Sequence, residues 1–211
     1  RFFEYMGKLG LLEKTGIDLA GEASTIIHKQ ENVGEVELAT MSFGQSFQIT
    51  PLQMLRAASA IINGGNLVTP HFAVKSVSEA DGTAVEFNYE IQSNAIEEKT
   101  SLMMKDILRQ VVEEGGGKKA YLEGFSIGGK TATSQKLPRG SGKYISSFIG
   151  FSPVDNAKVI AMCLIDEPQG IYYGGTIAAP VIRELFENIL PYLEIHIPEN
   201  LVDMYMGSHY F

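Results

Sequence analysis

Gly124–Gln135, with the sequence GFSIGGKTATSQ, is the stretch on which the interpretation of this chain depends. Its beginning fits the phosphate-loop pattern G-x-x-x-x-G-K-[ST], which favours a nucleotide hydrolase. Further along, an apolar run ends in Asp166 and Glu167, as strands that hold Mg²⁺ often do. A phosphate loop, however, lies between a buried strand and a helix. Residues 118–123 (KKAYLE) make a poor buried strand and residues 132–140 (ATSQKLPRG) do not begin a helix, so the nucleotide alternative is disfavoured.

The same stretch makes better sense as a β-strand, in which side chains alternate between two faces. Lys130, Ala132 and Ser134 would share one face, and Thr131 and Thr133 the other. A strand of this kind beside a cleft offers a cation, hydroxyl groups and backbone N–H groups to an anionic or acyl substrate. From these residues alone, a solvated edge strand whose lysine protects against aggregation is the favoured interpretation.

The rest of the chain predicts an α+β domain, because helices and antiparallel hairpins are interleaved. Thr50, Pro51 and Gln53 predict a capped helix start, and the turn signal Asp81-Gly82 predicts a hairpin. The expected inward faces are Met104, Ile107, Leu108, Val111 and Val112 of one helix and Val181, Leu185 and Ile189 of the last one. The expected helices cover residues 1–9, 51–63, 100–114 and 179–190, and the expected strands 72–77, 84–88, 125–135, 146–151 and 159–165.

Composition excludes several classes of function. With 17 Lys and Arg against 25 Asp and Glu, the formal charge is −8, so nucleic acid is not an expected partner. Cys163 is the single cysteine, interpreted as a small core residue, and the four histidines lack metal-ligand spacing. No metal and no cofactor are expected. Asp166 and Glu167 are expected to face solvent or a loop.

Several separate blocks resemble class B penicillin-binding proteins, and look closest to the stage V sporulation type D group. The blocks keep the order and spacing of that family, and the resemblance covers residues 1–193, with 194–211 expected to be a tail or linker. It implies part of the serine β-lactamase/penicillin-binding transpeptidase fold, an antiparallel sheet flanked by helices. The blocks are TGIDLAGEA (15–23), SFGQSFQITPLQ (42–53), VVEEGGGKKA (111–120), GKTATSQ (129–135), YISSFIG (144–150) and YYGGTIAAP (172–180).

The resemblance implies a D,D-transpeptidase that cross-links peptidoglycan. In the family a serine attacks a D-Ala-D-Ala stem peptide and passes the acyl group to an amine, and β-lactams trap that serine. Of the three family motifs, S-x-x-K, S-x-N and K-T-G, only the third has a counterpart here. The other two are expected upstream of Arg1, so this chain is expected to be an inactive fragment. A binding or scaffold module of the same fold, without chemistry, is the alternative.

The resemblance also implies roles for individual residues. Lys130 and Thr133 would be catalytic: the lysine supplies positive potential, and the Thr133 N–H joins the oxyanion hole. Thr131, Ala132, Ser134 and Tyr173 would bind substrate, with Ala132 replacing the usual glycine.

Implied partners are the stem peptide, β-lactams and a membrane glycosyltransferase partner of the parent protein. The implied place is the extracytoplasmic face of the cell membrane, with an anchor upstream. The stage V sporulation group further implies a role in spore cortex formation. An unpaired edge of the strand 159–165 would invite dimerisation.

Overall fold

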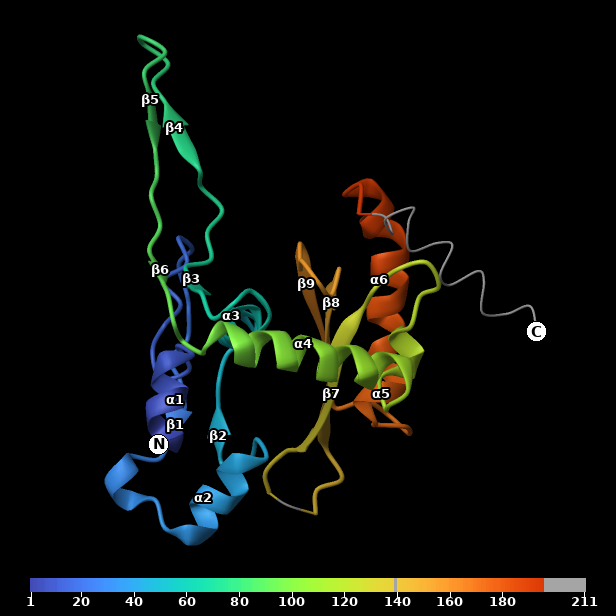
Figure 1. Cartoon of the computed structure of the whole chain (residues 1–211). Coiled ribbons are helices and arrows are strands. Elements are labelled where there is room, and N and C mark those ends of the chain that lie inside the picture. The colour runs from blue at the N-terminus through green and yellow to red at the C-terminus, as the bar shows by residue number, and fades with distance from the viewer. Residues whose placement is uncertain (139, 196–211) are drawn as a thin grey trace, which may run out of the picture. The chain divides into compact units, whose positions relative to one another are not determined.

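The computed structural model describes residues 1–138 and 140–195 (Figure 1). The chain forms two compact units, Arg1–Leu102 and a second that begins at Met103. Helices and antiparallel sheets are present in both, which confirms the predicted α+β class. No helix among the described residues is long and apolar enough to cross a membrane.

The first unit consists of short helices and three two-stranded antiparallel sheets, β1–β2, β3–β6 and β4–β5. The predicted hairpin is present as β4–β5, which projects as a long arm in Figure 1. The elements are α1 (Phe2–Lys8), β1 (Ile26–Ile27), η1 (Gln30–Asn32), α2 (Glu35–Ser42), β2 (Phe47–Gln48), α3 (Pro51–Ile62), β3 (Leu67–Val68), β4 (Lys75–Val77), β5 (Ala84–Glu86) and β6 (Ile91–Gln92).

The start of α3 is the capping box that the sequence predicts. The Gln53 N–H donates to Thr50 Oγ1 at 3.1 Å, and the Thr50 N–H donates to Gln53 Oε1 at 2.8 Å. The amide nitrogen of the fully buried Gln53 also donates to the carbonyl of Glu13 and to the hydroxyl of Thr25. This one side chain therefore both begins the helix and ties it to two distant segments.

Replacing Thr50 with alanine removes the acceptor for the Gln53 N–H and is expected to cost about 1 kcal/mol of unfolding free energy. Urea unfolding measures the loss. Thr50→Ser keeps the hydroxyl and is expected to retain most of the stability; an equal loss in both variants would contradict the capping role.

Asp18 in the TGIDLAGEA block anchors the base of the β4–β5 arm. Its carboxylate accepts the N–H groups of Phe72, at 2.9 and 3.1 Å, and of Ala73, at 2.7 Å. These two N–H donors, that of Ala73 foremost, hold the pKa of Asp18 below its ordinary value. The block thus has a local structural role.

The second unit contains an antiparallel sheet of three strands in the order β7-β8-β9, formed by the strands expected at residues 125–135, 146–151 and 159–165. Helix α6 packs against β8 and β9. Helix α4 (Glu98–Glu113) begins in the first unit and ends in the second. The elements are α4 (Glu98–Glu113), η2 (Lys118–Ala120), β7 (Gly128–Gln135), β8 (Tyr144–Ser152), β9 (Val159–Asp166), α5 (Gly174–Ile177) and α6 (Ala179–Tyr192).

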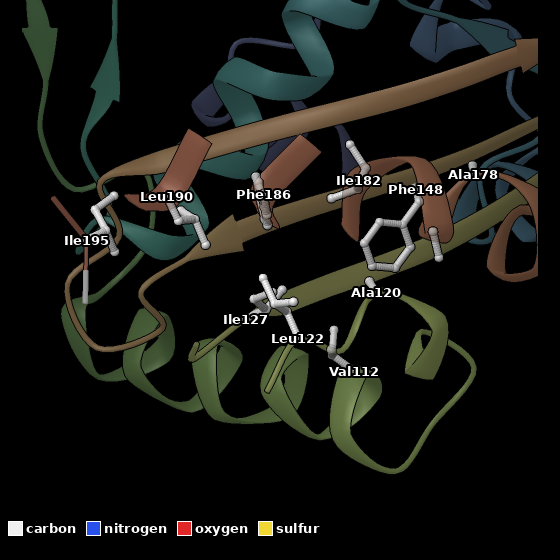
Figure 2. Packing of buried hydrophobic residues seen from close by; sticks show 11 residues of the cluster. Val112, Ala120, Leu122, Ile127, Phe148, Ala178, Ile182, Phe186, Leu190 and Ile195 are labelled. Carbon is white, nitrogen blue, oxygen red and sulfur yellow. The ribbon is translucent and has the colours of Figure 1, made fainter. Parts of the chain in front are cut away.

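The core of the second unit lies between one face of this sheet and α4, η2 and α6 (Figure 2). Phe148 of β8 and Phe186 of α6 are fully buried in it. Cys163 of β9 is half-buried against the same core, and burial raises the pKa of its thiol, which confirms a packing role. Ile195 also packs into this cluster; residues 196–211 of the expected tail lie outside the described residues.

The predicted inward face of α6 is wrong at Val181 and Leu185, whereas Ile189, its third residue, is partly buried against the core. Val181 and Leu185 are 46% and 40% exposed, while the stripe Ile182, Phe186 and Leu190 is buried. Two adjacent apolar stripes compete on this helix, and the one with the larger side chains fills the core. In α4, Val112 is buried as predicted, but Ile107 is 51% exposed, against prediction.

Candidate active site

β7 is an extended strand from Gly128 to Gln135, and residues 136–138 are not helical. Lys130 and Thr131 therefore lie within a β-ladder, paired with Ile149 and Phe148. No helix N-terminus follows them, so the geometry of a phosphate loop is absent from this part of the chain. The nucleotide-hydrolase alternative is wrong.

Close packing explains the two glycines that begin the strand. A Cβ on Gly128 would lie 2.3 Å from the ring of Phe151, and one on Gly129 would lie 2.5 Å from the ring of Phe148. The rings lie directly over the strand, which only residues without side chains permit. They hold the start of β7 against the sheet immediately before Lys130.

One edge of β7 has no neighbouring strand among the described residues. Just beyond the strand, the Lys136 N–H donates to the Lys143 carbonyl across the pair, at 2.9 Å. Residues of an antiparallel strand direct their N–H and C=O groups alternately to either side. By this alternation the backbone groups of Thr131 and Thr133 point away from β8, toward the free edge.

The predicted site residues separate into two groups. Thr131, Thr133 and Tyr173 line a common cavity of about 380 Å³, whereas Lys130, Ala132 and Ser134 do not line it. The Lys130 side chain is exposed, and its ammonium donates to the Thr131 carbonyl at 2.7 Å. The cavity is lined by Gly116, Lys118, Lys119, Thr131, Thr133, Tyr173, Gly174, Gly175 and Thr176.

The start of α5 and the residue before it, Tyr173, form one wall of this cavity, which is bound tightly to the sheet. The Gly174 N–H donates to Thr133 Oγ1 at 3.0 Å. A Cβ on Gly174 would lie 2.3 Å from the Ala132 carbonyl oxygen and 2.4 Å from that of Ser147. No other residue allows this approach, so Gly174 fixes the wall relative to Thr133.

Stacked tyrosines support the same wall. The rings of Tyr144 and Tyr172 stack with centroids 3.9 Å apart, and Tyr173 lies 4.6 Å from Tyr172. The Ser146 hydroxyl donates to the Tyr172 carbonyl. A hydrogen bond with the Tyr172 hydroxyl raises the pKa of Tyr173. Tyr173 itself lines the cavity.

Asp166 and Glu167 belong to an ion-pair cluster at the far end of the hairpin. Lys136 Nζ lies 2.9 Å from Asp166 and 2.8 Å from Glu167, and Lys143 Nζ lies 3.0 Å from Glu167. These lysines, Lys136 foremost, lower the pKa of Glu167. Both acids are engaged in ion pairs, with no group of potential metal ligands in the described ranges.

Glu167→Gln is expected to lower the melting temperature slightly at pH 7 and to have no effect near pH 2. The folded-state pKa of Glu167 lies below its ordinary value of 4.5. Its stabilisation is therefore present above that value and is lost as the pH falls through the folded-state pKa. Thermal unfolding of both proteins over this pH range measures the difference, and a difference that persists at pH 2 would refute the assignment.

Sequence reasoning missed Gly116, Lys118, Lys119 and Thr176 as cavity residues. The two lysines follow α4 on η2, and Thr176 is on α5. The signal was present in the block GGGKKA, where two cations follow three flexible residues. Nothing local in the sequence shows, however, that this turn lies beside β7.

A family model described as the penicillin binding protein transpeptidase domain matches residues 1–187. Stage V sporulation protein D of Bacillus subtilis is 38% identical over 208 residues, which are 96% of this chain and 32% of that protein. The probable peptidoglycan D,D-transpeptidase PenA of Neisseria flavescens is 30% identical over 198 residues, 92% of this chain and 47% of that protein. This chain thus spans a third to a half of these curated relatives.

Solved structures show the same fold. Penicillin binding protein 3 of Mycobacterium tuberculosis, in its apo form, superposes with a TM-score of 0.84 at 26% identity, covering 94% of this chain and 47% of that one. Its complex with aztreonam gives a TM-score of 0.83 at 25% identity, with the same coverage of both chains.

Proposed function

Because this chain belongs to the family of penicillin binding protein transpeptidase domains, we propose that it supplies the third motif of a serine acyl-transfer site that cross-links peptidoglycan. The observation that carries the proposal is the geometry of β7. An extended edge strand bears an exposed lysine, and two threonines of the same strand line a cavity. This arrangement suits a peptide laid along a strand edge, bound through backbone hydrogen bonds.

In this proposal Lys130 and Thr133 are the catalytic residues of the segment. The Thr133 N–H, directed to the free edge by strand alternation, would donate to the oxyanion that forms when the acyl carbonyl is attacked. The Lys130 ammonium supplies positive potential beside it, because the side chain is exposed and bends over the edge to the Thr131 carbonyl.

The proposed substrate-binding residues are Thr131, Ala132, Ser134 and Tyr173. Thr131 and Tyr173 are supported by their place in the cavity wall. Ala132 and Ser134 are supported only by their position on the Lys130 face of the strand.

The attacking serine must come from elsewhere. The sequence has neither an S-x-x-K nor an S-x-N motif, and the chain spans a third to a half of its curated relatives. We propose that the nucleophile belongs to another part of the full-length protein, and that this chain alone does not react with β-lactams.

The proposed setting follows from the relatives. The donor is a stem peptide ending in D-Ala-D-Ala, and β-lactams are the inhibitors, because the similar penicillin binding protein 3 of Mycobacterium tuberculosis forms complexes with aztreonam and ampicillin. Action on peptidoglycan would place the protein on the extracytoplasmic face of the membrane, beside a glycosyltransferase partner. Similarity to a sporulation protein supports a role in the spore cortex.

Reaction with a fluorescent penicillin tests this proposal. The full-length protein is expected to carry one covalent label that survives denaturing electrophoresis, and an excess of unlabelled benzylpenicillin is expected to prevent it. The 211-residue chain is expected to remain unlabelled. A full-length protein that folds but takes no label would favour the scaffold alternative.

Ala132→Gly in the full-length protein is expected to change the acylation rate by less than about a hundredfold, equivalent to nearly 3 kcal/mol of barrier. Ala132 is accommodated in an unbroken β7–β8 register opposite Ser147, so its methyl group does not distort the strand. Stopped-flow acylation kinetics measure the rate. A larger gain would mean that the methyl group blocks the substrate directly.

We propose separately that the free edge of β9 pairs with the same edge of a second copy of the chain. β9 pairs only with β8 among the described strands, and such edges can pair with a second copy. Light scattering at high protein concentration tests whether dimers form; a monomer throughout would dismiss this proposal.

A further inference from the structure

The side chains that line the cavity beside β7 carry positive charge and no negative charge. Two of the residues that line it are lysines, Lys118 and Lys119, and none of the described lining residues is Asp or Glu. Three threonines and Tyr173 are the other lining residues with polar side chains. A cavity with two cations, hydroxyl donors and no carboxylate is suited to an anion.

Both lysines lie on backbone that is fixed by its surroundings. In η2 the Lys118 N–H donates to the Gly115 carbonyl at 3.2 Å, and the Ala120 N–H to the Gly117 carbonyl at 2.8 Å. Ala120 is fully buried, and a Cβ on Gly117 would lie 3.1 Å from the ring of Phe148. The turn is therefore anchored in the core while its two lysine side chains remain exposed.

Neither lysine has a carboxylate partner within the described ranges. Three other lysines of this unit are engaged: Lys136 and Lys143 pair with acids, and Lys105 donates to the Asp155 carbonyl. Lys130, the lysine of the third motif, donates to the Thr131 carbonyl and does not line the cavity. The positive charge inside the cavity thus comes from Lys118 and Lys119.

We infer that Lys118 and Lys119 make this cavity a subsite for a side-chain carboxylate of the peptide substrate. The inference rests on the proposed function, because that function supplies the peptide lying along the edge of β7. Thr133 Oγ1 already accepts the Gly174 N–H, so its own hydroxyl proton is available for the carboxylate. The two lysines are specificity-determining residues, which select an acidic peptide over its amide.

The test compares two fluorescent peptides that end in D-Ala-D-Ala and differ at one side chain, a carboxylate in one and a carboxamide in the other. Their affinities for the full-length protein are measured by fluorescence anisotropy. The double variant K118Q/K119Q is expected to bind the acid about tenfold more weakly, and the amide with less than a twofold change. The matched control K158Q, an exposed lysine at the β8–β9 turn outside the cavity, is expected to leave both affinities unchanged.

Ionic strength gives a second measurement of the same subsite. Added salt is expected to weaken binding of the acid to the unmodified protein more steeply than to K118Q/K119Q. Equal losses for acid and amide, or no loss for the acid, would overturn the subsite.

Labelling by fluorescent penicillin, run in parallel, tests the proposed function separately. A labelled protein in which K118Q/K119Q does not discriminate between the peptides keeps its proposed function and loses the subsite. An unlabelled protein loses the proposed function, and with it the assignment of a peptide as the ligand.

Discussion

Replacing Gly174 with alanine is expected to slow acylation of the full-length protein by benzylpenicillin about a hundredfold. The added Cβ would lie 2.3 Å from the Ala132 carbonyl oxygen and 2.4 Å from that of Ser147. Both oxygens belong to paired strands, so they cannot move without disturbing the β7–β8 ladder. The segment that contains Gly174 must lift instead, which breaks its hydrogen bond to Thr133 and displaces Tyr173 from the cavity wall.

The same substitution is expected to cost about 1–3 kcal/mol of unfolding free energy, as overpacking of a tight contact does. Stopped-flow acylation and urea unfolding measure the two effects. Gly7→Ala is the matched control, because the new methyl group on α1 would meet only Leu12, at 3.9 Å. If Gly174→Ala reacted at the normal rate, the wall would have no role in positioning Thr133.

Phe148→Ala is expected to destabilise the second unit by about 3–5 kcal/mol. Phe148 is fully buried, and its ring fills the space between the sheet and the turn that contains Gly117. No neighbour can fill the cavity left behind without moving the sheet. A protein of ordinary stability loses a large part of its free energy of unfolding through this one change.

Denaturant unfolding of the protein with and without the substitution measures this loss. Phe72→Ala is the matched control, since Phe72 is 71% exposed and the same truncation there is expected to cost less than about 0.5 kcal/mol. Similar losses for the two phenylalanines would show that Phe148 does not contribute to the core as its burial indicates.

Prediction from the sequence succeeded where the signal is local. The capping box at Thr50 and Gln53 depends on residues three apart, and the structure has both of its hydrogen bonds. The strands expected at residues 125–135, 146–151 and 159–165 are present as β7, β8 and β9. They pair in sequence order, because strands that follow one another along the chain usually lie side by side.

Prediction failed where one pattern fits two arrangements. Helix α6 has two adjacent apolar stripes, and periodicity alone did not distinguish Val181 and Leu185 from Ile182 and Phe186. The space left by Phe148 and its neighbours on the sheet decides between them, and that space exists only in the folded unit.

The sequence by itself determined that GKTATSQ forms a strand, because Pro and Gly follow it and no helix can begin there. It also determined the family, because the order and spacing of the matching blocks can be read from the sequence without a structure. Only the tertiary structure decided that Lys118 and Lys119 lie at the cavity while Lys130 does not line it. The physical reason is that strand alternation sets the face of each residue locally, whereas the approach of a distant turn is set by core packing around Phe148 and Gly117.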